Sequence, residues 1–288
     1  METKLRIAVQ SKGRLYDETM ELLGESGIKL AAVKRTLLVP SRNFPVELLF
    51  LRDDDIPESV ANGTADVGIV GLNEVMEQNK EVKLLKELGF SKCRLSLAIP
   101  KRTEYNGLSW FNNRKIATSY PEILTQFLNK NGIKADIHVI TGSVEIAPGI
   151  GLADGIFDIV SSGSTLVSNN LVEVENVVES QAVMIGASQG KLSQEKQLIL
   201  EELMFRIDAV KAADGKKYLL MNVPQEKLDE VLSVLPGIKS PTVLPLANAD
   251  WCSVHTVVEE KRLWEIVGKL KTAGAEGILT LDIEKMIL

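Results

Sequence analysis

Short apolar runs alternate with helical patterns through the first two-thirds of the chain. Residues 5–9, 46–51 and 67–70 have the length and apolar content of buried strands. Between the first two, residues 15–23 place apolar side chains at the spacing of one helix face. This alternation predicts an α/β fold with mostly parallel strands.

A repeat within this region predicts two similar lobes. Residues 6–11 resemble residues 115–119, and residues 62–71 resemble residues 155–163. In both pairs a small or polar turn follows the carboxyl end of a predicted strand, where open α/β sheets bind ligands. Two such lobes would face each other across a cleft. The residues alone leave chance similarity open as the alternative.

Residues 145–166 (EIAPGIGLADGIFDIVSSGSTL) contain the clearest candidate site. An apolar run at 156–160 is interrupted by Asp158 and ends in the hydroxyl-rich turn SSGST. Gly163 lets the backbone approach a ligand, and the neighbouring N–H and O–H groups can donate to an anion. Because a carboxylate repels phosphate but accepts hydrogen bonds from sugar hydroxyls, the segment predicts a sugar-phosphate site. The alternative is an ordinary strand, turn and helix cap.

The last third of the chain has a different pattern. Residues 192–210 form a long helical segment ending in the polar residues 213–217, which we interpret as a hinge. Pro224 suits the first turn of a helix that ends at residues 236–237. The predicted elements are a strand at 218–223, a helix at 228–235, strands at 242–246 and 251–258, a helix at 263–270 and a strand at 278–281. This order predicts a ferredoxin-like domain, and its lack of a catalytic cluster favours a regulatory or assembly role.

Composition narrows the class of protein. A chain of 288 residues exceeds the usual size of one core, and its net charge of −6 argues against a nucleic-acid or anionic-membrane surface. The N-terminus lacks a signal-peptide pattern, and no apolar stretch is long enough to span a membrane. Isolated cysteines (Cys93, Cys252) and only two histidines (His138, His255) argue against a disulfide framework, a zinc site or a Ser-His-Asp triad. We therefore expect a cytoplasmic protein.

Nearly the whole chain resembles the long form of the ATP phosphoribosyltransferase family, the first enzyme of histidine biosynthesis. The most specific match is within 145–166, at Glu145, Gly151, Ala153, Ile156, Asp158, Ser162, Gly163, Thr165 and Leu166. The other matching segments are 10–15, 52–57, 66–71, 89–95, 115–121, 142–145, 240–246 and 282–286. The resemblance implies that ATP and 5-phosphoribosyl 1-pyrophosphate (PRPP) condense, with Mg²⁺ as cofactor, to N1-(5-phosphoribosyl)-ATP and pyrophosphate.

The resemblance also implies the architecture. Residues 1–97 and 184–214 are expected to form catalytic lobe I on the ATP side, and residues 98–183 lobe II with the PRPP loop. Together the lobes should resemble a type II periplasmic binding protein. Residues 215–288 should form the ferredoxin-like regulatory domain, which in the family binds histidine as a feedback inhibitor and assembles as dimers and hexamers. A short form lacks this tail and needs a partner subunit.

Combined with the patterns above, the resemblance assigns site residues. We expect PRPP to contact Asp154, Asp158, Ser161, Ser162, Gly163, Ser164, Thr165 and Leu166, with the carboxylates on ribose and the turn on the 5′-phosphate. We expect ATP to contact Lys12, Gly13, Arg14, Arg52 and Gly71. The expected catalytic residues are Glu145, Asp158 and Arg14. The expected histidine effector site is Asn222, Thr242 and Gly277; some relatives have an acidic residue in place of Asn222, which leaves the partner of the effector's amino or imidazole group open.

Two assignments keep alternatives. Glu145 is either a carboxylate that favours positive charge at the anomeric carbon or a helix-start charge in a capping pattern. Residues 53–55 are either carboxylates near Mg²⁺ or, with Arg52, an arginine-paired turn before Pro57, so no protein metal ligand is assigned. Two other classes of protein are alternatives to an enzyme. One is a small-molecule binding protein that catalyses no reaction, for which an export signal would be expected. The other is a cytoplasmic amino-acid sensor whose two lobes are a degenerate enzyme. The intact turn and residues 12–14 argue against the sensor.

Overall fold

The computed structural model describes residues 3–31, 36–190, 192–235 and 241–288. They form two compact units, one of residues up to 24 with 28–200 and the other of residues 25–27 with 201–288. The predicted helix end at residues 236–237 lies outside the described residues. The predicted boundaries of the lobes and of the regulatory domain stay predictions. In the described parts of the chain, no helix has both the length and the apolar character needed to cross a membrane.

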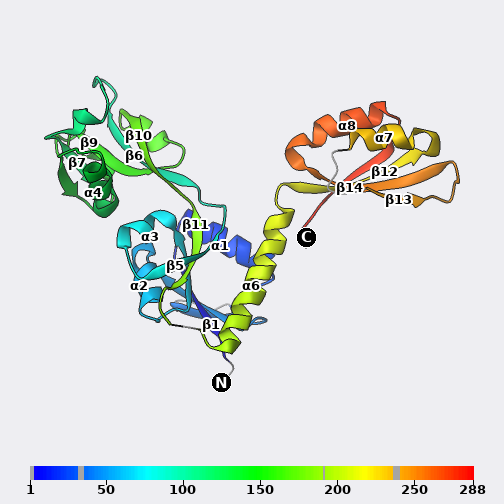
Figure 1. The fold of residues 1–288 in the computed structure, drawn as a ribbon, viewed down its shortest axis with the longest axis horizontal. Coiled ribbons are helices and arrows are strands. Elements are labelled where there is room, and N and C mark those ends of the chain that lie inside the picture. The colour runs from blue at the N-terminus through cyan, green and yellow to red at the C-terminus, as the bar shows by residue number, and fades with distance from the viewer. Residues whose placement is uncertain (1–2, 32–35, 191, 236–240) are drawn as a thin grey trace. The chain divides into compact units, whose positions relative to one another are not determined.

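Lobe I of the first unit is built on a six-stranded sheet in the order β2-β3-β1-β4-β11-β5 (Figure 1). Its centre is parallel, since β1 pairs with β3 on one side and β4 on the other. The edge strand β2 is antiparallel to β3, and β11 is antiparallel to both β4 and the other edge strand, β5. The elements are β1 (Leu5–Gln10), α1 (Arg14–Glu25), β2 (Leu38–Pro40), β3 (Val46–Leu51), α2 (Ile56–Ala61), β4 (Val67–Gly71), α3 (Leu72–Gln78), β5 (Val82–Glu87) and β11 (Ala182–Ala187).

Lobe II contains a five-stranded sheet in the order β10-β6-β9-β7-β8 (Figure 1). Its parallel part is β8-β7-β9, and β6 runs antiparallel between β9 and β10. The elements are β6 (Cys93–Pro100), β7 (Lys115–Thr118), α4 (Pro121–Lys130), β8 (Asp136–Val139), β9 (Gly155–Val160), α5 (Ser164–Ser168) and β10 (Leu171–Ser180).

The two sheets confirm the repeat seen in the sequence. The similar segments 6–11 and 115–119 fall on β1 and β7, and each of these strands lies between two parallel neighbours. The second similar pair falls on β4 and β9. The prediction of mostly parallel strands is only partly right. The chain crosses from β5 into β6 and returns from β10 into β11, so the strands that follow each crossing run antiparallel.

Close packing holds these layers together. Ile7, Val9 and Ile69 are fully buried in the sheet of lobe I. Gly68 is required here by space, because a Cβ atom at that position would lie 2.7 Å from Cγ2 of Ile56 on α2. Helix α2 therefore lies directly on β4.

The second unit contains the ferredoxin-like domain, whose antiparallel sheet has the order β13-β14-β12-β15. The elements are α6 (Gln194–Ala213), β12 (Lys216–Pro224), α7 (Leu228–Val234), β13 (Thr242–Pro245), β14 (Trp251–Glu259), α8 (Leu263–Thr272) and β15 (Glu276–Asp282). Helix α6 continues from the first unit into the second. The predicted fold class is confirmed, with two corrections. Pro224 is the last residue of β12 and caps the 3-10 turn Gln225–Lys227 that leads into α7, so it lies just before the first helical turn instead of within it. Lys216 already belongs to β12, which shortens the predicted hinge.

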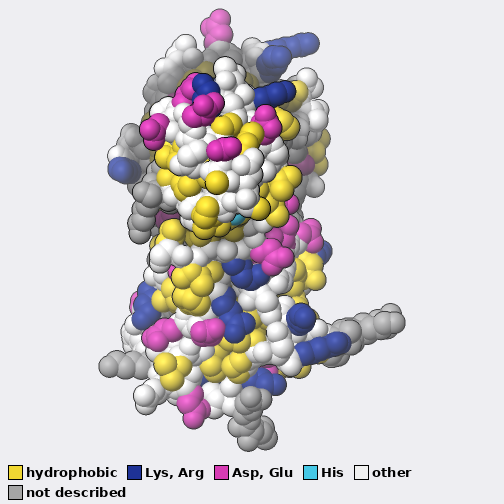
Figure 2. Space-filling model, turned by 90° about the vertical axis from the view of Figure 1, so that its right-hand side faces the viewer, with side chains coloured by type: hydrophobic (Ala, Val, Ile, Leu, Met, Phe, Trp, Pro, Cys, Tyr) yellow, Lys and Arg dark blue, Asp and Glu magenta, His cyan; other side chains and the backbone are white. Residues whose placement is uncertain are grey.

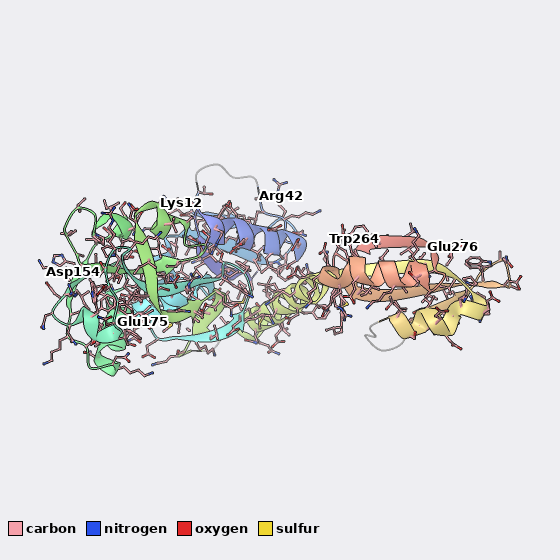
Figure 3. All side chains as sticks on the ribbon, turned by 90° about the horizontal axis from the view of Figure 1, so that it is seen from above. Lys12, Arg42, Asp154, Glu175, Trp264 and Glu276 are labelled. Atoms are coloured by element: carbon pink, nitrogen blue, oxygen red, sulfur yellow. The ribbon has the colours of Figure 1, made fainter. Side chains whose placement is uncertain are left out.

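Helices α7 and α8 cover one face of this sheet (Figure 1). Leu219, Met221 and Val223 alternate on β12 and are fully buried against the helices, as period-two patterning requires. Hydrophobic side chains also reach the surface, where they are interspersed with charged groups (Figure 2). Trp264 on α8 is 83% exposed (Figure 3).

Candidate functional site

The turn after β9 forms the centre of the candidate site. Gly163 has φ of +79°, a left-handed conformation that glycine adopts without strain, and helix α5 begins at the next residue. The hydroxyls of Ser162 and Ser164 lie 3.0 Å apart, and Ser162 Oγ accepts from the Ser164 N–H at 3.4 Å. Both serines are accessible rather than buried. The turn therefore presents backbone and hydroxyl donors at the carboxyl edge of the lobe II sheet.

An arginine that the sequence analysis did not assign supports this turn from behind. The Arg94 guanidinium is bound to both carboxylate oxygens of Glu173, and its other terminal nitrogen donates to the Ser161 carbonyl at 3.3 Å. Ser96 Oγ also donates to Glu173 at 2.7 Å. Arg94 lowers the pKa of Glu173, so this carboxylate stays ionised and holds the arginine in place. The only signal in the sequence was that Arg94 falls in the matching segment 89–95.

Asp158 and Glu145 are brought near each other. Burial raises the pKa of Asp158 from 3.8 to about 6, the N–H of Ile159 opposes the rise, and the negative charge of Glu145 adds to it. Glu145 lies in a one-turn helix whose preceding residue, Ser143, makes no side-chain capping bond. The reciprocal bond of a capping box is therefore missing on the Ser143 side. This leaves Glu145 available to face a ligand next to Asp158.

Asp154 is not brought to the turn. It precedes the first residue of β9, and its carboxylate accepts from the Lys115 N–H at 2.8 Å at the amino edge of the sheet. A strand of six residues separates it from Ser161, or about 20 Å at the usual rise per residue. Asp154 also lies four residues before Asp158, or about 13 Å at the same rise per residue, so we leave it out of the proposed ribose contacts.

The lobe I wall is formed by turns that follow parallel strands. Lys12 and Gly13 follow β1, and the side chain of Lys12 is exposed at the surface (Figure 3). Gly13 has φ of +94° with open space around it, so the turn needs glycine for its conformation. Arg14 starts α1, and its guanidinium donates to the Lys92 carbonyl at 3.2 Å in the segment that crosses between the lobes. These charges lie at the carboxyl end of the sheet, as the sequence predicted.

The turn after β3 adopts the arginine-paired alternative. Arg52 donates to both carboxylate oxygens of Asp54 at 3.1 and 3.0 Å. The Arg52 side chain is still 75% exposed, so an incoming anion can reach it. Asp53 instead points to the neighbouring strand end, where Gln10 donates to it at 3.4 Å. This pairing brings the carboxyl ends of β1 and β3 together.

Buried polar residues line the base of this region, and the sequence analysis missed them. Asn73 and Glu74 at the start of α3 are only 5% and 7% exposed. Burial and, secondly, the charge of Asp53 raise the pKa of Glu74 from 4.5 to about 7. Tyr120 of lobe II hydrogen-bonds to Glu74, and burial followed by the Glu74 charge raises the pKa of its hydroxyl. Gly71 leaves room for Asn73, whose Oδ1 would lie 2.4 Å from a Cβ atom at position 71.

Comparisons with known proteins now decide the family. A family model described as ATP phosphoribosyltransferase matches residues 52–209, and one described as "HisG, C-terminal domain" matches residues 213–285. The chain belongs to the ATP phosphoribosyltransferase family. It is 68% identical to the ATP phosphoribosyltransferase of Bacteroides thetaiotaomicron over 99% of this chain and 100% of that protein. The identity to the enzyme of Cytophaga hutchinsonii is 55% over 100% of both chains.

A solved structure agrees with this family. The ATP phosphoribosyl transferase (HisG:HisZ) complex from Thermotoga maritima matches with a TM-score of 0.60 and 26% identity. The match covers 70% of this chain and 98% of that chain. The match of the C-terminal family model and the full-length coverage of the relatives confirm the long-form resemblance. The chain is an ATP phosphoribosyltransferase, a pentosyltransferase.

The described residues contain no group of three or more His, Cys, Asp or Glu side chains arranged to hold a metal ion. The nearest candidates, Asp53 and Asp54, are already engaged by Gln10 and Arg52.

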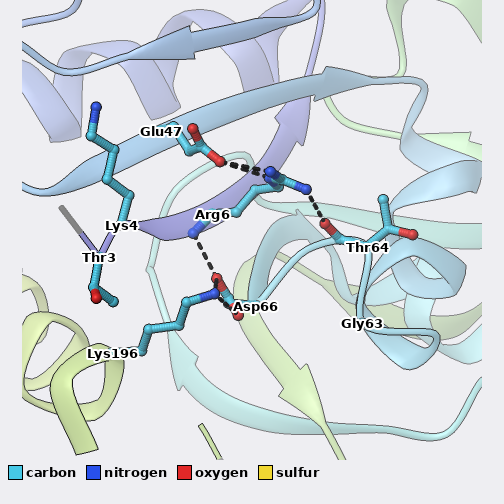
Figure 4. A pocket seen from close by; sticks show the side chains of 8 residues that line it. All are labelled: Thr3, Lys4, Arg6, Glu47, Gly63, Thr64, Asp66 and Lys196. Atoms are coloured by element: carbon cyan, nitrogen blue, oxygen red, sulfur yellow. Dashed lines mark hydrogen bonds and ion pairs between the residues drawn. The ribbon is translucent and has the colours of Figure 1, made fainter. Parts of the chain in front are cut away.

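A cavity of about 590 Å³ lies at the opposite, amino edge of the lobe I sheet (Figure 4). Arg6 binds Glu47 and the Thr64 carbonyl there, while Lys196 of α6 binds Asp66. These charges neutralise one another, so the cavity has the character of an ion network that fastens α6 to the sheet. The lining residues are Thr3, Lys4, Arg6, Glu47, Gly63, Thr64, Asp66 and Lys196.

The predicted effector residues of this family member lie on the C-terminal sheet. Asn222 pairs in register with Ser253, and Thr242 with His255, so β14 separates them on one face. Gly277 has φ of +56°, and a Cβ atom there would lie 3.4 Å from Asn222 Nδ2. The structure therefore brings Asn222 and Gly277 together, with Thr242 two strands away from Asn222.

Proposed function

We propose that this ATP phosphoribosyltransferase condenses ATP with PRPP to N1-(5-phosphoribosyl)-ATP and pyrophosphate in the first step of histidine biosynthesis. The observation that carries the proposal is the exposed Ser/Gly turn at 161–165 beside the partly buried carboxyl of Asp158. A turn of donors next to a carboxylate matches a sugar phosphate, because donors bind the phosphate and the carboxylate binds sugar hydroxyls.

On the PRPP side, Ser161–Leu166 would hold the 5′-phosphate through N–H and O–H donors. Asp158 would accept hydrogen bonds from ribose hydroxyls in its ionised form. Glu145 would lie near the anomeric carbon, where its charge favours an oxocarbenium-like state. Arg94 would keep the turn in register through Ser161, without contacting the substrate.

On the ATP side, Lys12, Arg14 and Arg52 would bind the triphosphate, with Gly13 and Gly71 allowing close approach of the backbone. Adenine N1 already carries the lone pair that attacks the anomeric carbon, so no general base is required. The main contribution of the protein is then to align the two substrates, an effect that can be worth about 7–11 kcal/mol. Mg²⁺, held by substrate phosphates, would neutralise charge on the leaving pyrophosphate.

Gly163→Val tests the proposed phosphate turn. A Cβ atom at 163 meets only Val160 Cγ1, at 4.0 Å, so folding is tolerated, whereas the positive φ is strained for a β-branched residue. The turn should relax and misdirect its N–H donors, which typically costs about 10²–10³-fold in turnover. The assay follows the ultraviolet absorbance of the adduct from ATP, PRPP and Mg²⁺.

Two variants control for strain. Gly163→Asn should keep most activity, since asparagine tolerates a left-handed conformation. Gly63→Val introduces a β-branched residue at nearly the same φ, +78°, in open space at the amino edge of the lobe I sheet, outside the proposed site, and it should leave turnover unchanged. Near-normal turnover of Gly163→Val would refute the phosphate-turn assignment.

For the C-terminal domain we propose histidine as a feedback inhibitor bound near Asn222, Thr242 and Gly277, in an enzyme that forms homodimers and hexamers in the cytoplasm. The support is a sheet face that carries polar groups in register beside a residue with positive φ. Isothermal titration of histidine into the intact protein should show saturable binding that Thr242→Val weakens. No heat of binding to the intact protein would overturn the effector assignment.

A further inference from the structure

Helix α3 of lobe I is bound at its start to the segment that joins the two lobes. The Leu72 N–H donates to the Gln181 carbonyl at 2.9 Å, in the return crossing between β10 and β11. Asn73 N–H donates to Ser180 Oγ at 3.0 Å, and that hydroxyl donates back to Asn73 Oδ1 at 2.8 Å. Asn73 and Ser180 are both 5% exposed, so these bonds are shielded from water.

The same helix reaches into lobe II through Tyr120. Asn73 Nδ2 donates to Tyr120 Oη at 3.3 Å and to Glu74 Oε1 at 3.0 Å. The Tyr120 hydroxyl is hydrogen-bonded to Glu74 as well. Both polar ends of the Asn73 amide are therefore satisfied, and its partners come from the crossing segment, from α3 and from lobe II. A small displacement of lobe II that does not admit water would leave these buried polar groups without partners, which is costly.

One turn further along, α3 caps a helix of the other lobe. The two carboxylate oxygens of Glu77 accept from the N–H groups of Glu122 and Ile123, each at 3.0 Å. These are first-turn donors of α4, which need an external acceptor. The residue before α4 is Tyr120, and it makes no side-chain capping bond. The cap that a serine or aspartate would usually supply thus comes from a carboxylate 45 residues away in the other lobe.

We propose that Asn73, Glu74 and Glu77 form an interlobe latch, in which they act as positioning residues for the transfer reaction. The latch holds α4 and Tyr120 of lobe II against α3, and it fixes the angle at which the two strand-end walls face each other. After burial and Glu74, the negative charges of Asp158 in lobe II and Asp53 in lobe I also raise the pKa of the Tyr120 hydroxyl, so this hydroxyl lies within electrostatic reach of both walls.

The latch acts through alignment. Each substrate is bound mainly by one wall, so weakening the latch leaves both binding surfaces intact but lets their separation vary. Small errors in the placement of reacting atoms reduce turnover steeply. The expected signature is therefore a lower kcat with little change in the KM for either substrate. The inference rests on the two-walled site proposed above.

Glu77→Gln tests the latch in the full-length protein. The amide keeps one acceptor but loses the charge, and it turns a donor toward an N–H of α4. We expect kcat to fall at least tenfold, while the KM values for ATP and PRPP each stay within threefold. Hydrogen exchange followed by mass spectrometry should show faster exchange at the start of α4 and no change in β1 or β9.

Glu122→Gln is the matched control. Glu122 places a carboxylate in the same first turn of α4, but its side chain binds Gln126 of the same helix instead of lobe I. It should change kcat by less than twofold. Tyr120→Phe is a second test that keeps the ring in the core and removes only the hydroxyl, and it should lower kcat in the same direction as Glu77→Gln.

Three outcomes separate the ideas. If Glu77→Gln and Tyr120→Phe both keep kcat within twofold, or if Glu122→Gln loses as much as Glu77→Gln, the latch is refuted. If Gly163→Val is inactive while the latch variants are fully active, only the latch fails. If Gly163→Val is fully active, the proposed two-walled site itself fails.

Discussion

Replacing Glu74 with glutamine should remove a pH dependence of stability. Glu74 is 7% exposed, and its pKa rises from 4.5 to about 7, mainly through burial and then through the charge of Asp53. Between these two values the native protein holds a proton that the unfolded chain has released. The stabilisation is therefore fully present below about pH 4.5 and is lost as the pH rises through about 7.

The size of the effect follows from the pKa. A rise from 4.5 to about 7 corresponds to about 3 kcal/mol of unfolding free energy, at about 1.36 kcal/mol per pH unit. Tyr120 and Asn73 donate hydrogen bonds to the Glu74 carboxylate and favour its ionised form. Because these bonds lower the pKa, the value of about 7 and the 3 kcal/mol derived from it already contain their effect. Glu74→Gln cannot ionise. Its stability relative to wild type should increase by about 3 kcal/mol between pH 4.5 and pH 8.

Urea unfolding at pH 5, 6, 7 and 8 measures this difference. Because the two units can unfold separately, the probe must report on the first one. Trp110 lies in that unit, whereas Trp251 and Trp264 lie in the second. Fluorescence in a background with Phe at 251 and 264 therefore isolates the relevant transition. A difference between Glu74→Gln and wild type that stays constant within about 1 kcal/mol across this range would contradict the argument.

Three further predictions address packing and the PRPP site. Gly68→Val should lower the unfolding free energy by about 1–3 kcal/mol, because its Cβ would overlap Ile56, and an unchanged urea midpoint would contradict this. Arg94→Lys keeps the charge but loses the bidentate contact with Glu173. The KM for PRPP should therefore rise about tenfold while the KM for ATP is unchanged. Equal changes in both KM values would contradict a specific role of Arg94 in the turn. The kcat/KM for PRPP should fall below about pH 6 as Asp158 takes up a proton, and Asp158→Asn should show low activity without this acid limb. A wild-type profile flat down to pH 5 would rule out ionised Asp158 as the ribose acceptor.

Local patterning predicted the elements well. Alternation and helical spacing found β1, β3 and β4 close to their observed limits, because buried strands and helix faces leave a direct mark on the sequence. The β-α-β-β-α-β order of the tail also followed from local signals, and it led to the observed antiparallel sheet. Parallel pairing was over-predicted, since the direction of β6 and β11 depends on the crossings between the lobes rather than on their own residues.

Some residues of the candidate site could also be predicted from local sequence patterns, and others could not. Gly163 and its serines could be found from sequence, because a turn that needs a left-handed residue and offers hydroxyls is encoded within five residues. Asp154 looked equivalent to Asp158 from sequence alone, but the length of one strand separates it from the turn. No local pattern marked Glu74 or Glu77, since their partners in lobe II lie about 45 residues further along the chain.

The sequence by itself determined the family, the order of elements and the position of the Ser/Gly turn at 161–165, because these depend on short-range periodicity and on residues with special backbone freedom. The tertiary structure alone decided which strands run antiparallel, which carboxyl groups lose water and rise in pKa, and which helix of one lobe is capped by the other. The physical reason is that burial, electrostatic interactions and hydrogen bonds of this kind each depend on two segments that are far apart in the sequence. They exist only once distant parts of the chain have been packed against each other.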